Sequence, residues 1–392
     1  MGSSIDVNNP GAIAAASFLS AIGALVFNIM PLFLGSMVES LGFNEQQAGF
    51  IASAYLGGFT LTSFSAVFWS RRVSWHKVVL AAAVVAVASY GLCLMSSAFT
   101  AILILMACVG LAKGGFFAIA LCSLGDTKVP DRSFGLAVLA QVCMGGLGLF
   151  ALSAVTQHWG FKGILVGLIG VTVLVVFLLR WMPTHGLKEE TSVQAGSAGR
   201  KFPVFVGLGG MLLLMAGMSG IWAFLERIGA VGGLSANSIG NVLSASLFAG
   251  AAAALMVAWL SDRLGRAIPI FIGTGIMLAG IICLAGQASL IVFASAAIML
   301  MGGWTFAYPY QMAAISMADS SGRFVALIAA AQGIGAALGP GLAGSMAAGG
   351  SYTGVYIMSA VCVVVSLVMF QWLVFNTNVG AKFNKLVKSQ NS

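Results

Sequence analysis

The chain has 392 residues, of which 60% are hydrophobic and only 7% are charged. This composition excludes a water-soluble domain, in which apolar residues make up about half of the chain. The formal net charge is +8, and the placement of the basic residues excludes a nucleic-acid-binding surface, as shown below. We therefore predict an all-α polytopic membrane protein.

Twelve apolar segments of 20 or more residues follow one another along the chain. Each is long enough to cross the roughly 30 Å hydrocarbon core of a bilayer as one helix, so we expect twelve transmembrane helices. The six cysteines fall inside these segments, so the sequence predicts neither a disulfide nor a metal site. The expected spans are residues 12–38, 46–69, 77–97, 99–125, 133–156, 161–182, 203–228, 237–260, 267–286, 289–317, 323–347 and 351–375.

The basic residues gather on one side of this topology. Fifteen of the 18 lie in the connections that follow even-numbered spans and in the C-terminal tail, whereas the connections that follow odd-numbered spans hold only Lys162. Short cytoplasmic loops carry an excess of Lys and Arg. The sequence therefore predicts that both termini and the 183–202 loop are cytoplasmic, in a cell inner (plasma) membrane. The charge sets the orientation and does not indicate a nucleic-acid partner.

A shift of 191 residues aligns the chain with itself at three separate places. We therefore predict an N-terminal six-helix half (12–182), a cytoplasmic linker (183–202), a C-terminal six-helix half (203–375) and a cytoplasmic tail (376–392). Asn44 is expected to cap the second span, with Gln47 completing a capping box. The segments that align are 42–49 with 233–240, 70–72 with 261–263, and 132–148 with 323–339.

The segment SDRLGR, residues 261–266, resembles the loop motif Gly-x-x-x-Asp-Arg-x-Gly-Arg of the major facilitator superfamily. The twelve spans, the cytoplasmic termini and the long central loop are similar to that family too. In the first half the segment reads WSRRVSW, with Arg71 in place of the Asp and Ser74 in place of the Gly. The resemblance implies two pseudo-symmetric halves around a central site, which work as a secondary transporter, not an enzyme, without a cofactor.

The resemblance also implies a gate at the cytoplasmic face, built from the loop motif. Asp262 is expected to approach the start of the fifth span near Arg132, where the helix dipole favours an anion. Arg71 or Arg72 is expected to face the start of the eleventh span, near Asp319. Alternatively, Asp319 only caps its helix and Arg71 only anchors at lipid headgroups. Two further arginines of the motif, Arg263 and Arg266, complete the predicted gate.

Three ionisable residues lie inside predicted spans, where charged side chains are costly and usually functional. Lys113 lies near the middle of the fourth span and is interpreted as an anchor for an anionic substrate group, or else as a structural ion pair, with Glu226 for example. Glu226 is the candidate proton-coupling group; alternatively, Glu226 and Arg227 seal the outer gate. Since neighbouring residues cannot easily pair with each other, each should have a partner on another helix.

The remaining candidates are aromatic and amide side chains on helices that line the cavity in the resembled family. Trp304, Tyr308 and Gln311 share one face of the tenth span by their spacing, and such a face suits a small organic molecule. Trp222 shares a face with Glu226 in the seventh span. Three amides fall within spans and are expected either to line the cavity or to join helices by hydrogen bonds: Asn28, Gln141 and Gln332.

Together these patterns predict a proton-coupled transporter of a small organic solute. Because the only charge near mid-membrane is positive, a small organic anion such as a carboxylate is favoured, with import by symport. A multidrug or metabolite exporter is the alternative, although the fifth span lacks the proline that antiporters of the family commonly carry there. A non-transporting membrane sensor or scaffold is a third hypothesis. Expected partners are the substrate, protons and the lipid bilayer, with the chain as a monomer.

Overall fold

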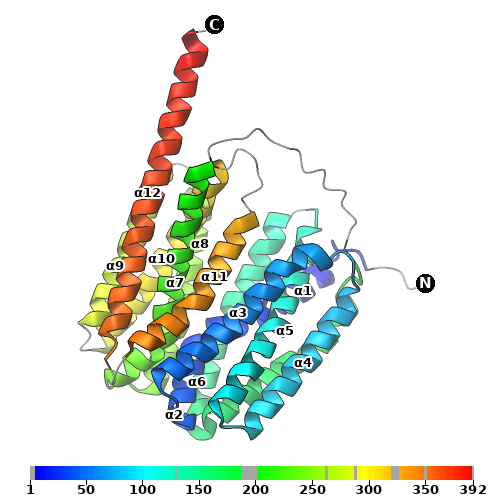
Figure 1. Ribbon diagram of the computed structural model, residues 1–392. Coiled ribbons are helices and arrows are strands. Elements are labelled where there is room, and N and C mark those ends of the chain that lie inside the picture. The colour runs from blue at the N-terminus through cyan, green and yellow to red at the C-terminus, as the bar shows by residue number, and fades with distance from the viewer. Residues whose placement is uncertain are drawn as a thin grey trace.

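The computed structural model describes residues 5–128, 130–186, 201–260, 264–286, 289–318, 326–347 and 351–390, and the described residues form a bundle of helices (Figure 1). Eleven of these helices are long and apolar enough to cross a membrane. The predicted all-helical polytopic fold is confirmed. The helices are α1 (Pro10–Asn28), α2 (Met30–Leu41), α3 (Glu45–Trp69), α4 (Trp75–Met95), α5 (Phe99–Gly125), α6 (Pro130–Leu178), the 3-10 turn η1 (Leu179–Trp181), α7 (Lys201–Val231), α8 (Ala236–Leu260), α9 (Ala267–Ala285), α10 (Leu290–Ala318), α11 (Ala326–Met346) and α12 (Thr353–Gln390).

The first predicted span is broken into α1 and α2 at Ile29, whose φ of −93° and ψ of 9° leave the helical geometry. Pro31 explains the break, because proline has no N–H and cannot donate to the carbonyl four residues earlier. That carbonyl belongs to Phe27. The break therefore leaves a backbone acceptor in the membrane interior that needs another donor.

The long helix α6 contains the fifth and sixth predicted spans, which reverse direction at Gly160. Its φ of 54° and ψ of −146° lie in a region open mainly to glycine. Beyond this residue the two arms pack side by side, because Gly163 lies against Val155 and Gly167 against Leu152. We call 130–159 the first arm and 161–178 the second arm. With this reversal the twelve predicted passes are all accounted for.

The bundle has two distinguishable ends (Figure 1). At one end α1 begins and α12 leaves the bundle, and we call this the terminal end. The opposite end, which we call the distal end, carries the connections 42–44, 96–98 and 232–235. The predicted capping box is confirmed there: the Asn44 side chain accepts from the Gln47 N–H at 2.8 Å, and the Asn44 N–H donates to Gln47 Oε1 at 3.2 Å.

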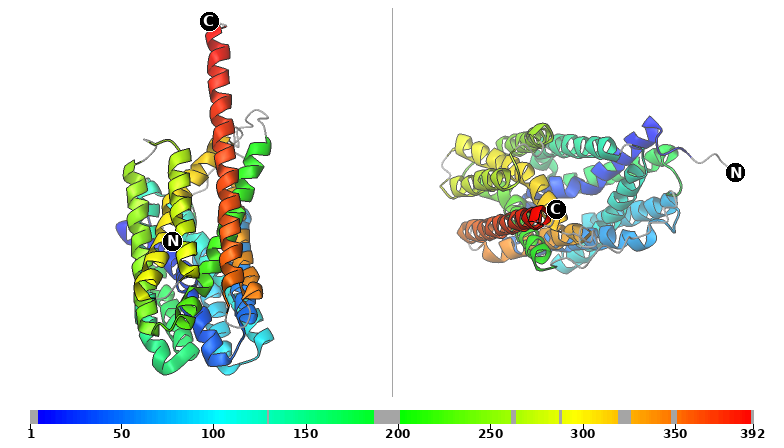
Figure 2. Two further views of the ribbon diagram at one scale, coloured as in Figure 1. Left: turned by 90° about the vertical axis from the view of Figure 1, so that its left-hand side faces the viewer. Right: turned by 90° about the horizontal axis from the view of Figure 1, so that it is seen from above.

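Helices α1–α6 meet helices α7–α12 along three pairs, α3 with α11, α6 with α8, and α2 with α7, and Figure 2 shows the two groups from the side and from above. Five hydrogen bonds join described residues across this junction, from the middle of the bundle to the distal end. They run from Trp222 Nε1 to Phe27 O (3.1 Å), Ser244 Oγ to Gly146 O (2.9 Å), Gly341 N to Ser53 Oγ (2.8 Å), Tyr352 OH to Glu45 Oε1 (3.3 Å) and Arg227 Nη1 to Glu39 Oε1 (3.2 Å).

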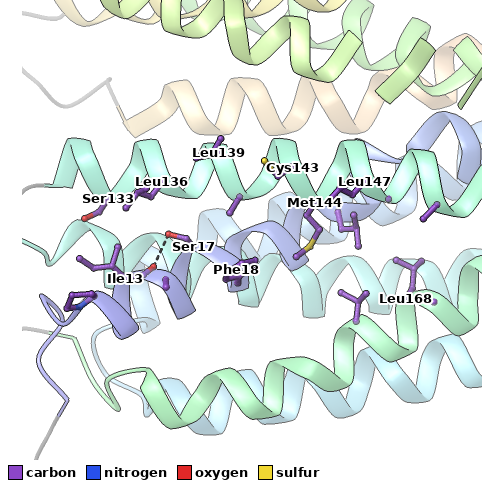
Figure 3. A pocket seen from close by; sticks show the side chains of 18 of the residues that line it. Ile13, Ser17, Phe18, Ser133, Leu136, Leu139, Cys143, Met144, Leu147 and Leu168 are labelled. Carbon is purple, nitrogen blue, oxygen red and sulfur yellow. Dashed lines mark hydrogen bonds between the residues drawn. The ribbon is translucent and has the colours of Figure 1, made fainter. Parts of the chain in front are cut away.

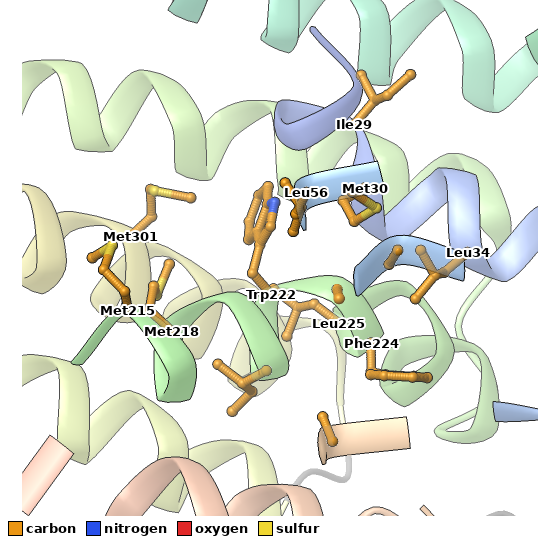
Figure 4. Close-up of a cluster of buried hydrophobic side chains, with 14 of the residues drawn as sticks. Ile29, Met30, Leu34, Leu56, Met215, Met218, Trp222, Phe224, Leu225 and Met301 are labelled. Carbon is orange, nitrogen blue, oxygen red and sulfur yellow. The ribbon is translucent and has the colours of Figure 1, made fainter. Parts of the chain in front are cut away.

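The largest hydrophobic core also crosses this junction (Figure 4). Trp222 of α7 is 1% exposed and lies among side chains from α2, α3 and α10, including Met30, Leu56 and Met301. Methionine side chains are flexible and fill irregular gaps. The core therefore joins the two groups of helices through adaptable side chains around one rigid indole.

Candidate functional site

The aromatic face predicted on the tenth span is present on α10. The ring centroids of Trp304 and Tyr308 lie 5.6 Å apart with 57° between the planes, and Gln311 follows on the same face with 0% exposure. The Gln332 side chain, from α11, lies close enough to Tyr308 to interact with it. We call these four residues the amide–aromatic cluster.

Several polar atoms of this cluster have no hydrogen-bond partner in the described structure. These are the indole Nε1 of Trp304 and both side-chain atoms, Oε1 and Nε2, of Gln311. Buried polar atoms in proteins are nearly always hydrogen-bonded, and an unpaired atom costs about 1–3 kcal/mol. The cluster therefore offers one donor from the indole, two donors and an acceptor from the amide, and two aromatic rings to a bound molecule.

The neighbours of α10 place the cluster at the inner side of the helix. Ile315, one turn beyond Gln311 on the same face, lies against Gly207 of α7. Gly303 and Ala307, on another face, lie against Gly273 of α9. Because Gln332 comes from α11, the cluster is bordered by α7 and α11, both of which contact helices of the α1–α6 group.

The Trp222 indole donates a hydrogen bond to the broken first span, so its N–H is not available to a substrate. Its Nε1 donates to the Phe27 carbonyl at 3.1 Å, the acceptor to which Pro31, lacking an N–H, cannot donate. A side chain of the C-terminal helices thus donates a hydrogen bond to a backbone carbonyl of the N-terminal helices. The predicted shared face of Trp222 and Glu226 is retained, since both are buried in α7.

Two of the predicted cavity amides join helices within α1–α6. Asn28 Nδ2 donates to the backbone carbonyl of Gln141 at 3.2 Å, and Gln141 Nε2 donates to Ser20 Oγ at 3.3 Å. Both contacts connect α1 to the first arm of α6. Of the two interpretations left open by the sequence, the described contacts match hydrogen bonding between helices.

Lys113 lies inside the N-terminal group of helices, where its side chain is fully enclosed. The side chain is 1% exposed, and Nζ donates to Thr172 Oγ1 of the second arm at 2.7 Å. Nζ also lies 5.1 Å from the ring centroid of Phe116 and 5.8 Å from that of Tyr90, within the range of cation–π attraction. The ammonium group is thus held by neighbouring helices, and the suggested pairing with Glu226 is replaced by the Thr172 contact.

Glu226 and Arg227 both reach the N-terminal helices at the distal end. Arg227 pairs with Glu39 of α2 at 3.2 Å, so the expected partner on another helix is present. Glu226 is 4% exposed and its carboxyl lies against Gly35, where a Cβ atom would overlap it. Its Oε2 has no partner in the described structure. Neither Glu39 nor Gly35 was identified from the sequence, because both partners are remote along the chain.

At the terminal end, one residue of the predicted gate makes a contact that the sequence did not predict. Arg71 pairs with Asp126, at the end of α5, at 2.6 Å, so this arginine contacts another N-terminal helix. The acid in LGDTK, just after the fourth span, was the available sequence signal for this pair. Arg72 is exposed and Arg266 is half-buried at the start of α9. Asp262, Arg263, Asp319 and the side chain of Arg132 lie outside the described residues.

Comparison with known proteins agrees with this architecture. The profile of the Major Facilitator Superfamily matches residues 13–225 and 207–391. The purine ribonucleoside efflux pump NepI of Escherichia coli O127:H6 (strain E2348/69 / EPEC) is 28% identical over 236 residues, which cover 56% of each chain. The match thus spans about half the length of this relative.

Solved structures share the fold across almost the whole chain. A bacterial homolog of the human lysosomal transporter Spinster, in an inward-facing and unoccupied conformation, has a TM-score of 0.71 at 14% identity and covers 95% of this chain and 98% of its own. The nucleoside transporter NupG has a TM-score of 0.73 at 13% identity, with 92% and 98% covered. Because the family profile matches both halves of the chain, the chain belongs to the major facilitator superfamily, and it is a multi-pass membrane protein.

Proposed function

We propose that this transporter carries a neutral heteroaromatic solute, with a purine nucleoside as the first candidate, and that the amide–aromatic cluster binds it. The observation that carries the proposal is the buried amide of Gln311, whose two polar atoms lack partners next to an unpaired indole N–H. A glutamine amide can form two hydrogen bonds to the edge of a purine base. Trp304 and Tyr308 offer rings on which a base can stack.

The names of two similar proteins support this substrate class. One is described as a purine ribonucleoside efflux pump and another as a nucleoside transporter. The organic anion expected from the sequence depended on Lys113, whose ammonium group is held by Thr172 and two rings. Lys113 therefore no longer supports an anionic substrate. An organic anion remains the alternative substrate in the test below.

The proposed mechanism is a rocking motion of the two six-helix halves, 12–182 and 203–375, about the cluster. The hydrogen bonds that join described residues across the junction extend to the distal end, where Arg227 Nη1 donates to Glu39 Oε1, which supports a conformation closed on that side. With the termini in the cytoplasm of a bacterial-type inner membrane, this is the state in which substrate exchanges with the cytoplasm. The chain works as a monomer in this proposal.

Glu226 is the proposed proton-coupling group, as expected from the sequence. An unpaired carboxylate is costly in a membrane interior, so a bound proton stabilises the contact of Glu226 with Gly35. That contact joins α7 to α2 at the distal end. Loss of the proton would weaken the contacts that close the distal end. Proton release would therefore favour the conformation that is open at the distal end.

The substrate site is tested with Gln311→Leu and the matched variant Gln371→Leu, by measuring adenosine and benzoate binding to purified protein. Gln311→Leu should weaken adenosine binding about ten-fold or more, as expected for two lost hydrogen bonds, without lowering the melting temperature. Gln371 donates to the Ala267 carbonyl at 2.8 Å, so Gln371→Leu should lower the melting temperature and keep the affinity. Unchanged adenosine binding in Gln311→Leu, or binding of benzoate alone, would reject this site.

A further inference from the structure

A groove on the outer side of the N-terminal helices is separate from the amide–aromatic cluster (Figure 3). It has a volume of about 990 Å³ and runs between α1 and both arms of α6. Phe18 of α1, Leu139 of the first arm and Leu168 of the second arm lie along it (Figure 3). Neither the transport mechanism nor the predicted site residues use this groove.

The groove opens toward the bilayer, since the apolar side chains that line it are exposed. Leu139 is 55% exposed, Leu147 is 63% exposed and Phe18 is 49% exposed, and all three lie within membrane-spanning segments. The surrounding medium at these positions is lipid. The groove is thus a recess in the lipid-facing surface, bounded by three membrane-spanning segments.

The polarity of the lining changes along the groove. Asn8, Lys128 and Ser133 lie at its terminal end, whereas Leu25, Leu147 and Leu152 line the deeper part. Ser17, which lies between, is already bonded to the Ile13 carbonyl at 2.8 Å. The lining therefore matches a molecule with a polar head at the terminal end and an apolar tail in the membrane.

The polar end of the groove is basic and lies at the level where lipid headgroups are expected. Lys128 is exposed, and its backbone N–H is fixed by Asn8 Oδ1 at 2.7 Å. Nearby, Arg180 stacks over Trp181 at 3.7 Å from the ring centroid, and Trp181 lies against Gly11 of α1. Such pairs of aromatic and basic residues mark the membrane interface.

One acid opposes this charge. Asp6 lies close enough to Lys128 to interact with it, and hydrogen bonds from the Asn8 backbone and side chain lower the pKa of Asp6. Asp6 is therefore ionised at neutral pH, with Oδ1 accepting two bonds from Asn8 at 2.9 Å each. Lys128 and Arg180 still leave the terminal end with a net positive charge.

We propose that this groove binds one anionic phospholipid, with the phosphate near Lys128 and an acyl chain between α1 and the arms of α6. From Pro10 to Leu25 the groove follows 16 residues of α1, a rise of about 22 Å along the helix. One leaflet of the hydrocarbon core is about 15 Å thick, so the groove is long enough for a full acyl chain.

The site is tested by native mass spectrometry of the purified full-length protein, titrated with phosphatidylglycerol or phosphatidylcholine of identical chains. Phosphatidylglycerol should bind about five-fold more tightly at one site, the difference expected for one basic residue at a membrane surface. Lys128→Gln should remove this preference. The matched control Lys77→Gln, which changes an exposed lysine at the start of α4, should retain it.

A second pair of variants tests the groove itself. Ala14 is exposed and lines the groove, whereas Ala81 is exposed on α4. Ala14→Trp should abolish tight binding of both lipids, and Ala81→Trp should leave it unchanged. Equal binding of the two lipids by the unmodified protein would overturn the proposal. So would an equal loss of preference in Lys128→Gln and Lys77→Gln, or retention of the site in Ala14→Trp.

Discussion

At the scale of single residues, Lys113 shows what the sequence could not predict, namely the contacts of its side chain. Its position in a membrane-spanning helix marks it as functional, but its partner Thr172 is 59 residues away. Local patterns place a residue on a helix face and do not specify which other helix covers that face. The shared face of Trp304, Tyr308 and Gln311 was predictable because it depends only on spacing along one helix. The environment of Lys113 was not predictable because it depends on which other helices pack around it.

Replacement of Lys113 separates a structural role from a substrate anchor. Lys113→Met keeps the volume of the side chain and removes a buried charge, whose desolvation is costly. We expect an unchanged or higher melting temperature and unchanged adenosine affinity, measured on the purified protein. Benzoate binding by the unmodified protein that is lost in Lys113→Met and retained in Gln311→Leu would restore the anion-anchor hypothesis.

Glu226 is the residue on which the proposed proton coupling depends. Glu226→Gln mimics the protonated side chain, so transport should lose its pH dependence, whereas the unmodified protein should favour the distal closure as the pH falls. Glu39→Gln is the control, because Glu39 is the 60% exposed partner of Arg227 at the same end. The measurement is the pH profile of adenosine exchange in proteoliposomes. A pH profile that is unchanged in Glu226→Gln and altered in Glu39→Gln would assign coupling to the ion pair.

At the scale of helices, the spans were predictable because twenty apolar residues have few alternatives to a transmembrane helix. The capping box at Asn44 was predictable because its two partners are three residues apart. The break between α1 and α2 was not predicted, although Pro31 signals it. Whether a proline bends a membrane helix depends on the donor that replaces its N–H, and here that donor comes from α7.

Because the Trp222 indole replaces the missing N–H of Pro31, we expect the effects of substituting these two residues on stability to be coupled. Trp222→Phe removes the indole donor to the Phe27 carbonyl and should destabilise the protein by about 1–3 kcal/mol. In the Pro31→Ala background the restored N–H can bond to that carbonyl, so the same substitution should cost less. A double-mutant cycle on melting temperature in detergent measures the difference. Equal losses in both backgrounds would mean that the indole contributes by packing alone.

At the scale of the whole molecule, the internal repeat and the loop motif led to the correct family, because both depend on long segments. The predicted gate at the terminal end stays a prediction, because Asp262, Arg263 and Asp319 lie outside the described residues. Arg71 pairs with Asp126 in the same group of helices, and a repeat alone cannot distinguish this contact from one across the junction. The proposed substrate class could not be predicted from the sequence either. It depends on the unpaired amide of Gln311, which can be identified only once the packing around it is known.

The most direct test of the account is exchange of radiolabelled adenosine in proteoliposomes that contain the unmodified protein, Gln311→Leu or Lys113→Met. A neutral heteroaromatic substrate bound by the amide–aromatic cluster predicts saturable exchange that nucleosides inhibit and benzoate does not. That exchange should be lost in Gln311→Leu and retained in Lys113→Met. Exchange of benzoate without adenosine, abolished in Lys113→Met, would contradict the account and assign the transporter to organic anions.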